Sequence, residues 1–290
     1  MKKGITRHSL SVKVITAMVI WFSGILIAHT GPSSNLAATF PKMIGKSKEK
    51  LYKDHTELLT EFFKKDRAVP WHVWHFKNTA KEDRYVLFSG KPLQQIPGKS
   101  GAVVRLFSAN GKQLGIWRVS TGWRMDIGDI QFGHNTNIQA KTINIKTVGW
   151  RGRPTKRLFF AFHRDVLYFV RAENSDGQLL RNNYLAPNIT LGGDVSTCTK
   201  KQWIKDLQSD STVTQLAALT YIAGVHMNPD KPSDKGYHSE SVDEARIAEE
   251  VRTDPAVKEA IERYRKAESK WLREVAEFAV KPKIQNGFRR

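Results

Sequence analysis

Between residues 84 and 172 the chain alternates short runs of β-branched and aromatic residues with turn-forming residues, and no helical pattern separates them. The runs lie at 84–90, 102–109, 113–120, 141–148, 157–163 and 166–172. Residues of these types favour strands. Strands so close in sequence pair antiparallel, because a parallel connection needs a longer crossover. The middle of the chain, residues 68–197, is therefore predicted to be an antiparallel β-rich domain.

Two dipeptides in this region predict the positions of tight turns. Asn110-Gly111 and Asp176-Gly177 are pairs that type I′ hairpin turns prefer, because both central residues of such a turn need positive φ. Arg164-Asp165 separates two strand-like runs and predicts a third hairpin.

The run at 102–109 indicates that the sheet is covered on both sides. In a strand, Val104 and Leu106 point to one face, and Val103 and Phe107 point to the other. Neither face is wholly polar, so we expect one to pack against a helix within 50–65 or against a second sheet.

Upstream of the strands, residues 42–67 carry a helical pattern. Charged residues alternate there with apolar residues at helical spacing, namely Leu51, Leu58, Leu59, Phe62 and Phe63. This segment is predicted to be an amphipathic helical linker.

The N-terminus, residues 1–30, has the pattern of a signal peptide or a signal anchor. Basic residues without any acid precede an uncharged apolar run of 15 residues at 14–28. A membrane span needs about 17–25 residues, so the run is slightly short for an anchor. The basic flank keeps the N-terminus cytoplasmic. We expect the remainder to be exported or extracytoplasmic, either released by cleavage near 34–39 or anchored by the apolar run.

The net charge of +19 and the isoelectric point near 10.0 favour anionic partners such as nucleic acid, acidic lipid or cell-envelope polymers. The only cysteine, Cys198, cannot form an intramolecular disulfide.

One basic turn stands out within the β-rich region. The string "WRGRPTKR" concentrates Arg151, Arg153, Lys156 and Arg157 between two predicted strands. Guanidinium groups gathered on a turn can hold phosphate or carboxylate by paired hydrogen bonds. These four residues are the candidate anion- or partner-binding site, and an ordinary solvated turn has the same composition.

Two histidines in "PWHVWHF" are the candidate metal ligands. His72 and His75 point to opposite faces in a strand but to one face in a helix, and no third ligand is near them in sequence. The loop at 226–238 also contains histidines and aspartates without the spacing of a calcium loop. A metal-dependent enzyme is thus one alternative, although no cofactor is predicted and no known catalytic motif is present.

The C-terminal third reads as helices. Residues 200–207 and 212–223 predict two short helices joined by a polar turn. A similar pattern returns at 249–272, where Asp254 and Val257 lie 44 residues after Asp210 and Val213. A single last helix is predicted from Pro255 to Val280, followed by a basic tail at 281–290.

The segment "LQSDSTVTQLAALTYIA" and its second copy resemble a HEAT repeat. The resemblance covers residues 199–280 and implies helical hairpins that bind other proteins and usually lack catalytic residues. Two units are fewer than the roughly three that bury a continuous core. We therefore expect this pair to pack on the β-rich domain or to form an oligomer.

These patterns together predict an α+β protein: an N-terminal signal or anchor helix, an antiparallel β-rich domain and a HEAT-like helical module. We expect an exported, non-enzymatic scaffold or accessory protein of the cell envelope that binds a protein partner. The first alternative is a binder of acidic polymer or anionic lipid through the basic β-rich domain, and the second is a metal-dependent enzyme.

Overall fold

The structure is a computed structural model. It describes residues 33–66, 69–90, 99–123, 125–149, 155–179, 200–224 and 253–280. The apolar run at 14–28, Arg151, Arg153, Cys198, the 226–238 loop and the basic tail lie outside the described residues. Within the described ranges, no helix combines the length and the apolar content that a membrane span requires.

Eight strands form two antiparallel four-stranded sheets, which confirms the predicted antiparallel pairing and the α+β class. The first sheet contains β1 (Val69–Lys77), β2 (Asp83–Gly90), β3 (Lys99–Ser108) and β4 (Gln113–Trp123). The second contains β5 (Met125–Asn135), β6 (Ala140–Gly149), β7 (Lys156–His163) and β8 (Val166–Asn174). In both sheets the spatial order follows the sequence, so every strand pairs with its neighbour in the chain.

The two sheets pack face to face around a shared apolar core. Val86, Val104 and Leu106 of the first sheet share this core with Ile143 and Leu158 of the second. Aromatic rings join the sheets directly. The ring centroid of Phe162 on β7 lies 5.3 Å from that of Phe76 on β1 and 6.0 Å from that of Trp117 on β4.

Two helices cover the outer face of the first sheet. They are α2 (Ser33–Met43) and α3 (Lys48–Asp66). Phe40 of α2 is fully buried, stacks on Tyr85 and meets the ring of Phe107 at a tilt of 45°. The first sheet is thus covered by helices on one face and by the second sheet on the other, as the alternation in β3 predicts.

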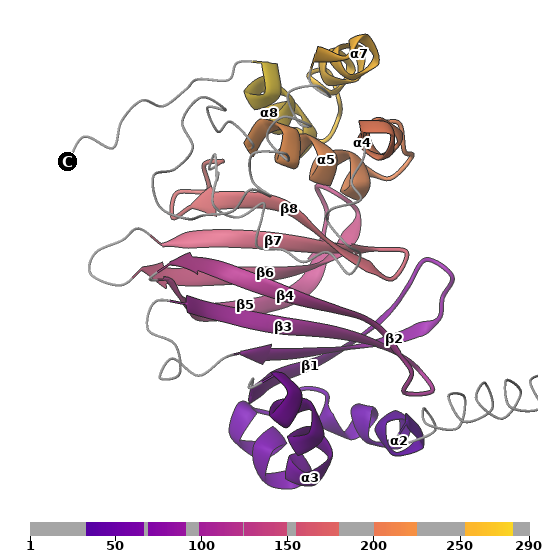
Figure 1. Cartoon of the computed structure of the whole chain (residues 1–290), viewed down its shortest axis with the longest axis vertical. Helices are drawn as coiled ribbons and strands as arrows, with labels where there is room; N and C mark the ends of the chain where they lie inside the picture. The colour runs from indigo at the N-terminus through magenta and orange to yellow at the C-terminus, as the bar shows by residue number, and fades with distance from the viewer. Residues whose placement is uncertain are drawn as a thin grey trace, which may run out of the picture.

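In the part of the chain that the structure describes, four helices lie over the outer face of the second sheet and form the helical module. They are α4 (Lys200–Leu207), α5 (Thr212–Gly224), α7 (Pro255–Tyr264) and α8 (Lys270–Val280). The molecule therefore stacks α2 and α3, the first sheet, the second sheet and the helical module in that order, with α2 and α3 at one end of its long axis and α7 and α8 at the other (Figure 1).

The single helix predicted for Pro255–Val280 is wrong, because the chain breaks between α7 and α8. α7 ends at Tyr264, and the hydroxyl of Ser269 accepts a hydrogen bond from the Leu272 backbone N–H at 3.4 Å at the start of α8. A serine in that position satisfies a free N–H group of a new helix. The break allows α8 to turn back and pack on both α7 and α5.

The hairpin turns differ from the predicted type I′ at both glycine dipeptides. Gly111 and Gly177 have positive φ (79° and 76°), whereas Asn110 and Asp176 do not. Each loop holds one residue more than a type I′ turn, so a type I turn precedes a glycine in the left-handed region. Arg164 and Asp165, with φ of 47° and 62°, have the positive values of a type I′ turn.

The β1–β2 turn has the same hydrogen bonds as the two glycine turns but places Lys81 at the left-handed position, with φ of 62°. A residue with a side chain raises the free energy of the folded state by about 1–2 kcal/mol when its φ is positive, and glycine avoids this cost. Lys81→Gly is expected to raise the free energy of unfolding by about 1 kcal/mol, measured by urea denaturation. The reverse change, Gly177→Lys, has open space around its Cβ and should lower stability by a similar amount. A loss of stability in Lys81→Gly would contradict the assigned strain.

Candidate functional site

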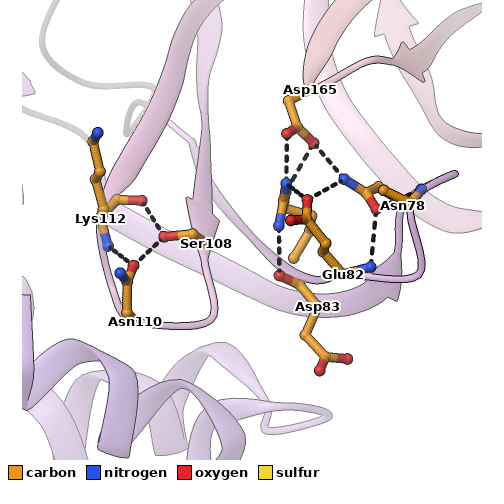
Figure 2. Close-up of polar contacts among 9 residues, drawn as sticks. Asn78, Glu82, Asp83, Ser108, Asn110, Lys112 and Asp165 are labelled. Atoms are coloured by element: carbon orange, nitrogen blue, oxygen red, sulfur yellow. Dashed lines mark hydrogen bonds and ion pairs between the residues drawn. The ribbon is translucent and has the colours of Figure 1, made fainter.

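A polar cluster fastens the two sheets together at the end where the hairpin turns lie. It consists of Asn78, Glu82, Arg84 and Asp165. Arg84, the second residue of β2, is buried, and its Nε and Nη2 donate to the two carboxylate oxygens of Asp165 at 2.8 and 2.7 Å. Its Nη2 also donates to Glu82 at 2.5 Å. Figure 2 shows Asp165 of the β7–β8 turn facing Asn78 and Glu82 of the β1–β2 turn.

The position of Asn78 explains why this cluster is ordered. The side-chain oxygen of Asn78 accepts hydrogen bonds from the backbone N–H groups of Ala80 and Glu82, both at 3.0 Å, and so closes the turn. Its Nδ2 donates to Glu82 at 3.1 Å. Paired hydrogen bonds from Arg84 lower the pKa of Asp165, because they favour the ionised carboxylate. This cluster is a structural ion-pair network that joins the two sheets.

Asp165→Asn is expected to lower the free energy of unfolding by about 1.5–3 kcal/mol at pH 7, the usual contribution of hydrogen bonds to a charged group. Asparagine keeps the positive φ of the turn, so the loss reports the charge. Because the folded-state pKa of Asp165 is lowered, its contribution is complete above the ordinary value of about 3.9 and disappears at lower pH. Urea denaturation of the unchanged protein and of Asp165→Asn from pH 7 to 2 measures the difference in their free energies of unfolding. Asp176→Asn, in an exposed turn, is the control. A difference in free energy of unfolding that stays constant down to pH 2 would show that the charge of Asp165 does not stabilise the fold.

The helical module is fastened to the second sheet by a buried arginine. Arg171 on β8 is 2% exposed, and its Nε donates to Glu173 Oε1 at 2.6 Å. Its Nη2 lies 2.6 Å from Glu274 Oε2 of α8, an ion pair without the alignment of a hydrogen bond. The guanidinium also lies 5.0 Å from the ring centroid of Trp271, within the range of a cation–π contact.

A β-bulge in β8 gives Arg171 this direction. Phe159 on β7 pairs with Arg171, and Phe160 pairs with Phe169, so Val170 is the extra residue on β8. Regular alternation would send Val170 and Arg171 to opposite faces. The bulge allows both to contact the helical module, where Val170 joins the apolar core.

Further contacts fix the inner layer of the module, formed by α5 and α8. Thr220 of α5 donates from its hydroxyl to the backbone carbonyl of Val170 at 2.8 Å. Ser269, just before α8, donates to the carbonyl of Asn137 in the β5–β6 turn at 2.9 Å. The edge of Trp271 meets the ring of Phe159 at 5.0 Å between centroids. The second sheet therefore covers one side of each inner helix.

The outer layer of the module is formed by α4 and α7, which contact each other and pack on α5 and α8 respectively. Its exposed side chains carry charges of both signs, namely Lys205, Lys258, Glu259, Glu262 and Arg263. Figure 1 shows α7 farther from the strands than α5, and α4 beside α5. This outer layer is the candidate partner-binding surface.

Of the predicted basic cluster, Lys156 and Arg157 are described, and they begin β7. Arg157 is exposed and pairs in register with Lys146 of β6, which is also exposed. Thr147 holds the strand start by hydrogen bonds with the backbone of Lys156 at 3.2 and 3.3 Å. Strand pairing thus adds Lys146 to the predicted group, a neighbour that proximity in sequence does not reveal.

The structure separates the two predicted histidines. His72 stacks on Trp74, with centroids 5.3 Å apart, and Trp74 stacks on Phe132 of β5 at 5.1 Å. Burial lowers the pKa of His72, and nearby Asp129 opposes part of this effect. His75 bonds to Asp83 at 2.8 Å. Within the described ranges, no three His, Cys, Asp or Glu side chains are grouped so that they can hold a metal ion.

Comparison of the chain with protein-family models, with curated proteins and with solved structures found no match.

Proposed function

We propose that the chain is an exported, membrane-tethered accessory protein that binds a protein partner through its helical module and has no catalytic activity. The observation that supports this is the two-layer arrangement of the module. Its inner layer contacts the second sheet through Arg171, Thr220 and Ser269, whereas its outer layer presents charged side chains to solvent. The HEAT-like character of the module is part of the proposal and rests on the sequence pattern.

Site-specific photocrosslinking in the native cell tests this function. A benzophenone amino acid replaces Lys205 on α4 or Glu259 on α7, both of which are exposed. The matched control positions are Lys112 and Asp176, which are exposed in turns of the sheets. We expect one protein to be captured at both helical positions and at neither control.

A charge exchange on α7 then tests whether the captured protein binds that surface. Lys258→Glu with Glu259→Lys keeps the net charge and should abolish capture at Lys205, because complementary charges are reversed. The matched exchange, Lys112→Glu with Asp176→Lys, should leave capture unchanged. Equal capture at helical and control positions, or capture that survives the α7 exchange, would overturn the proposed function.

Point changes are preferable to deletion of the module. Removal of the helices uncovers Phe159, Ala161 and Val170, which are now buried against them. A sheet with an exposed apolar face binds proteins non-specifically. A deletion would therefore create new contacts as well as remove native ones.

A second candidate function is binding of an acidic polymer, supported by the register pairing of the exposed Lys146 and Arg157. Binding of polyphosphate by the full chain should weaken steeply with salt. Lys146→Glu with Arg157→Glu should weaken it further than Lys258→Glu with Lys266→Glu, which removes the same charge from the helical module. Equal effects of the two variants would show that net charge alone attracts the polymer.

A further inference from the structure

The turn between α2 and α3 and the first part of α3 form a basic surface, here the α2–α3 surface. It comprises Lys42, Ile44, Lys46, Lys48, Lys50, Tyr52 and Lys53. All of these side chains are exposed except Lys46, which is partly buried. Residues 42–54 contain five lysines and two acids, a net charge of +3.

Exposed apolar side chains lie among these lysines. Ile44 is 43% exposed and Tyr52 is 51% exposed. The other large hydrophobic side chains exposed in the described part of the chain are Leu114, Val148 and Val280, which lie in β4, β6 and α8. Only the α2–α3 surface thus combines two such side chains with a group of lysines in the described residues.

Packing on the first sheet fixes the direction of this surface. Phe40, Met43 and Leu51 are fully buried beneath it, so the opposite side of the helices must face outward. Lys46 bonds to Asp54 at 2.7 Å, and this hydrogen bond lowers the pKa of Asp54. Lys48 lies 5.1 Å from the ring centroid of Trp71. The remaining lysines, Lys42, Lys50 and Lys53, extend the charge around Ile44 and Tyr52.

The sequence places this surface close to the apolar run. The run ends at Ala28, and α2 begins at Ser33. Five extended peptide units reach about 17 Å, and the headgroup layer on one side of a bilayer is about 5–7 Å thick. Leu36 is buried in α2, so a cut within 34–39 would remove part of the core. An uncleaved apolar run therefore holds α2 at the membrane interface.

We propose that the α2–α3 surface binds the anionic headgroups of the bilayer that holds the apolar run. This inference rests on the membrane tether of the proposed function and adds a second contact with the same membrane. The lysines neutralise lipid phosphates, while Tyr52 and Ile44 enter the interfacial layer that aromatic and apolar side chains favour. The helical module, at the opposite end of the long axis, then points away from the membrane (Figure 1).

Spin labelling of the full chain in lipid vesicles tests this contact. A nitroxide is attached at Ile44→Cys in a Cys198→Ala background, and collision rates with oxygen and with a water-soluble nickel complex report its surroundings. The control label is at Val148→Cys, which is 48% exposed on β6. In vesicles that contain phosphatidylglycerol, we expect the label at 44 to be reached by oxygen and shielded from nickel. The label at 148 should remain accessible to nickel.

Charge reversal identifies the headgroup contribution. The test variant is Lys42→Glu, Lys50→Glu and Lys53→Glu, and the matched variant is Lys112→Glu, Lys258→Glu and Lys266→Glu, all exposed. Each lysine near an anionic surface strengthens membrane binding by about fivefold. Loss of the three lysines should lower the ratio of lipid-exposed to water-exposed label at 44 by about 100-fold, and the three added glutamates should lower it further. The matched variant and circular dichroism of both proteins show that the change is local and that the fold is kept.

The outcomes separate this inference from the proposed function. A chain that does not float with vesicles overturns both the tether and the headgroup contact. A chain that floats with a label at 44 as accessible to nickel as the label at 148 overturns the headgroup contact alone. Equal effects of the two charge variants also overturn it, because they would assign the attraction to net charge. Photocrosslinking on α4 and α7 tests partner binding independently of these results.

Discussion

Replacement of Arg171 by methionine is expected to lower the free energy of unfolding by about 3–5 kcal/mol. Methionine has a similar length, so most of the loss comes from charge rather than from an empty space. The change leaves Glu173 buried without its hydrogen-bond donor and separates Glu274 of α8 from the second sheet. It also removes the cation from the face of Trp271.

Urea denaturation and amide hydrogen exchange measure this effect. Exchange should rise in α8 more than in the strands, because Glu274 connects that helix to the sheet. The triple variant Arg171→Met, Glu173→Gln and Glu274→Gln should recover much of the loss, since no buried charge is left unpaired. Arg157→Met, at an exposed position near the start of β7, is the control and should change stability by less than about 0.5 kcal/mol. A loss below 1 kcal/mol in Arg171→Met would show that the arginine does not fasten the module.

Replacement of Trp117 by alanine is the second large effect, with an expected loss of about 3–5 kcal/mol. Trp117 is 2% exposed between the sheets and meets the ring of Phe162 edge-on. A Cβ on Gly115 would lie 2.3 Å from its indole, so the glycine provides the space that this ring occupies. Removal of the ring leaves a cavity that the paired strands cannot close.

Two further variants separate volume from other causes. The Nε1 of Trp117 is buried without a hydrogen-bond partner, so Trp117→Phe loses volume but no polar contact. It should cost less than about 1.5 kcal/mol. Gly115→Ala should cost about 1–3 kcal/mol by displacing the indole. Denaturation curves of the three variants test this order, and a loss in Trp117→Phe as large as that in Trp117→Ala would contradict it.

The β-rich region was predictable where the sequence alternates clearly, and the exceptions have physical causes. The pattern of β3 indicates two covered faces, because Val104 and Phe107 are apolar on opposite sides. β1 is difficult to predict, because the histidines and tryptophans of "PWHVWHF" fit a strand or a helix equally well. β5 was not predicted, because Gly128 and Gly133 interrupt its apolar positions.

The ion pairs that fasten the layers could not be predicted, because their partners are distant in sequence. Arg84 and Asp165 are 81 residues apart, and each looks like an ordinary surface charge by itself. The direction of Arg171 depends on a bulge, which shifts the alternation by one residue. Local patterns therefore indicate strands and turns, whereas contacts between layers depend on the assembled fold.

Only part of the candidate surfaces follows from the sequence. Lys156 and Arg157 were identified by proximity, but their neighbour Lys146 becomes visible only through strand register. In the sequence, the lysines of the α2–α3 surface contribute to the overall positive charge but do not stand out as a group. The signal that identifies them is their position shortly after the apolar run, beginning 14 residues beyond Ala28, combined with the exposed Ile44 and Tyr52.

The sequential order of the strands determines how an emerging chain can fold. Because the strands within each sheet pair in chain order, each hairpin closes over a short loop and no strand waits for a distant partner. In the export that we propose, the N-terminus stays cytoplasmic and the residues after the apolar run cross the membrane in chain order, so α2, α3 and the first sheet emerge before the second sheet. The first sheet is therefore expected to form during translocation, and the docking of the C-terminal helices through Arg171 to be the last step.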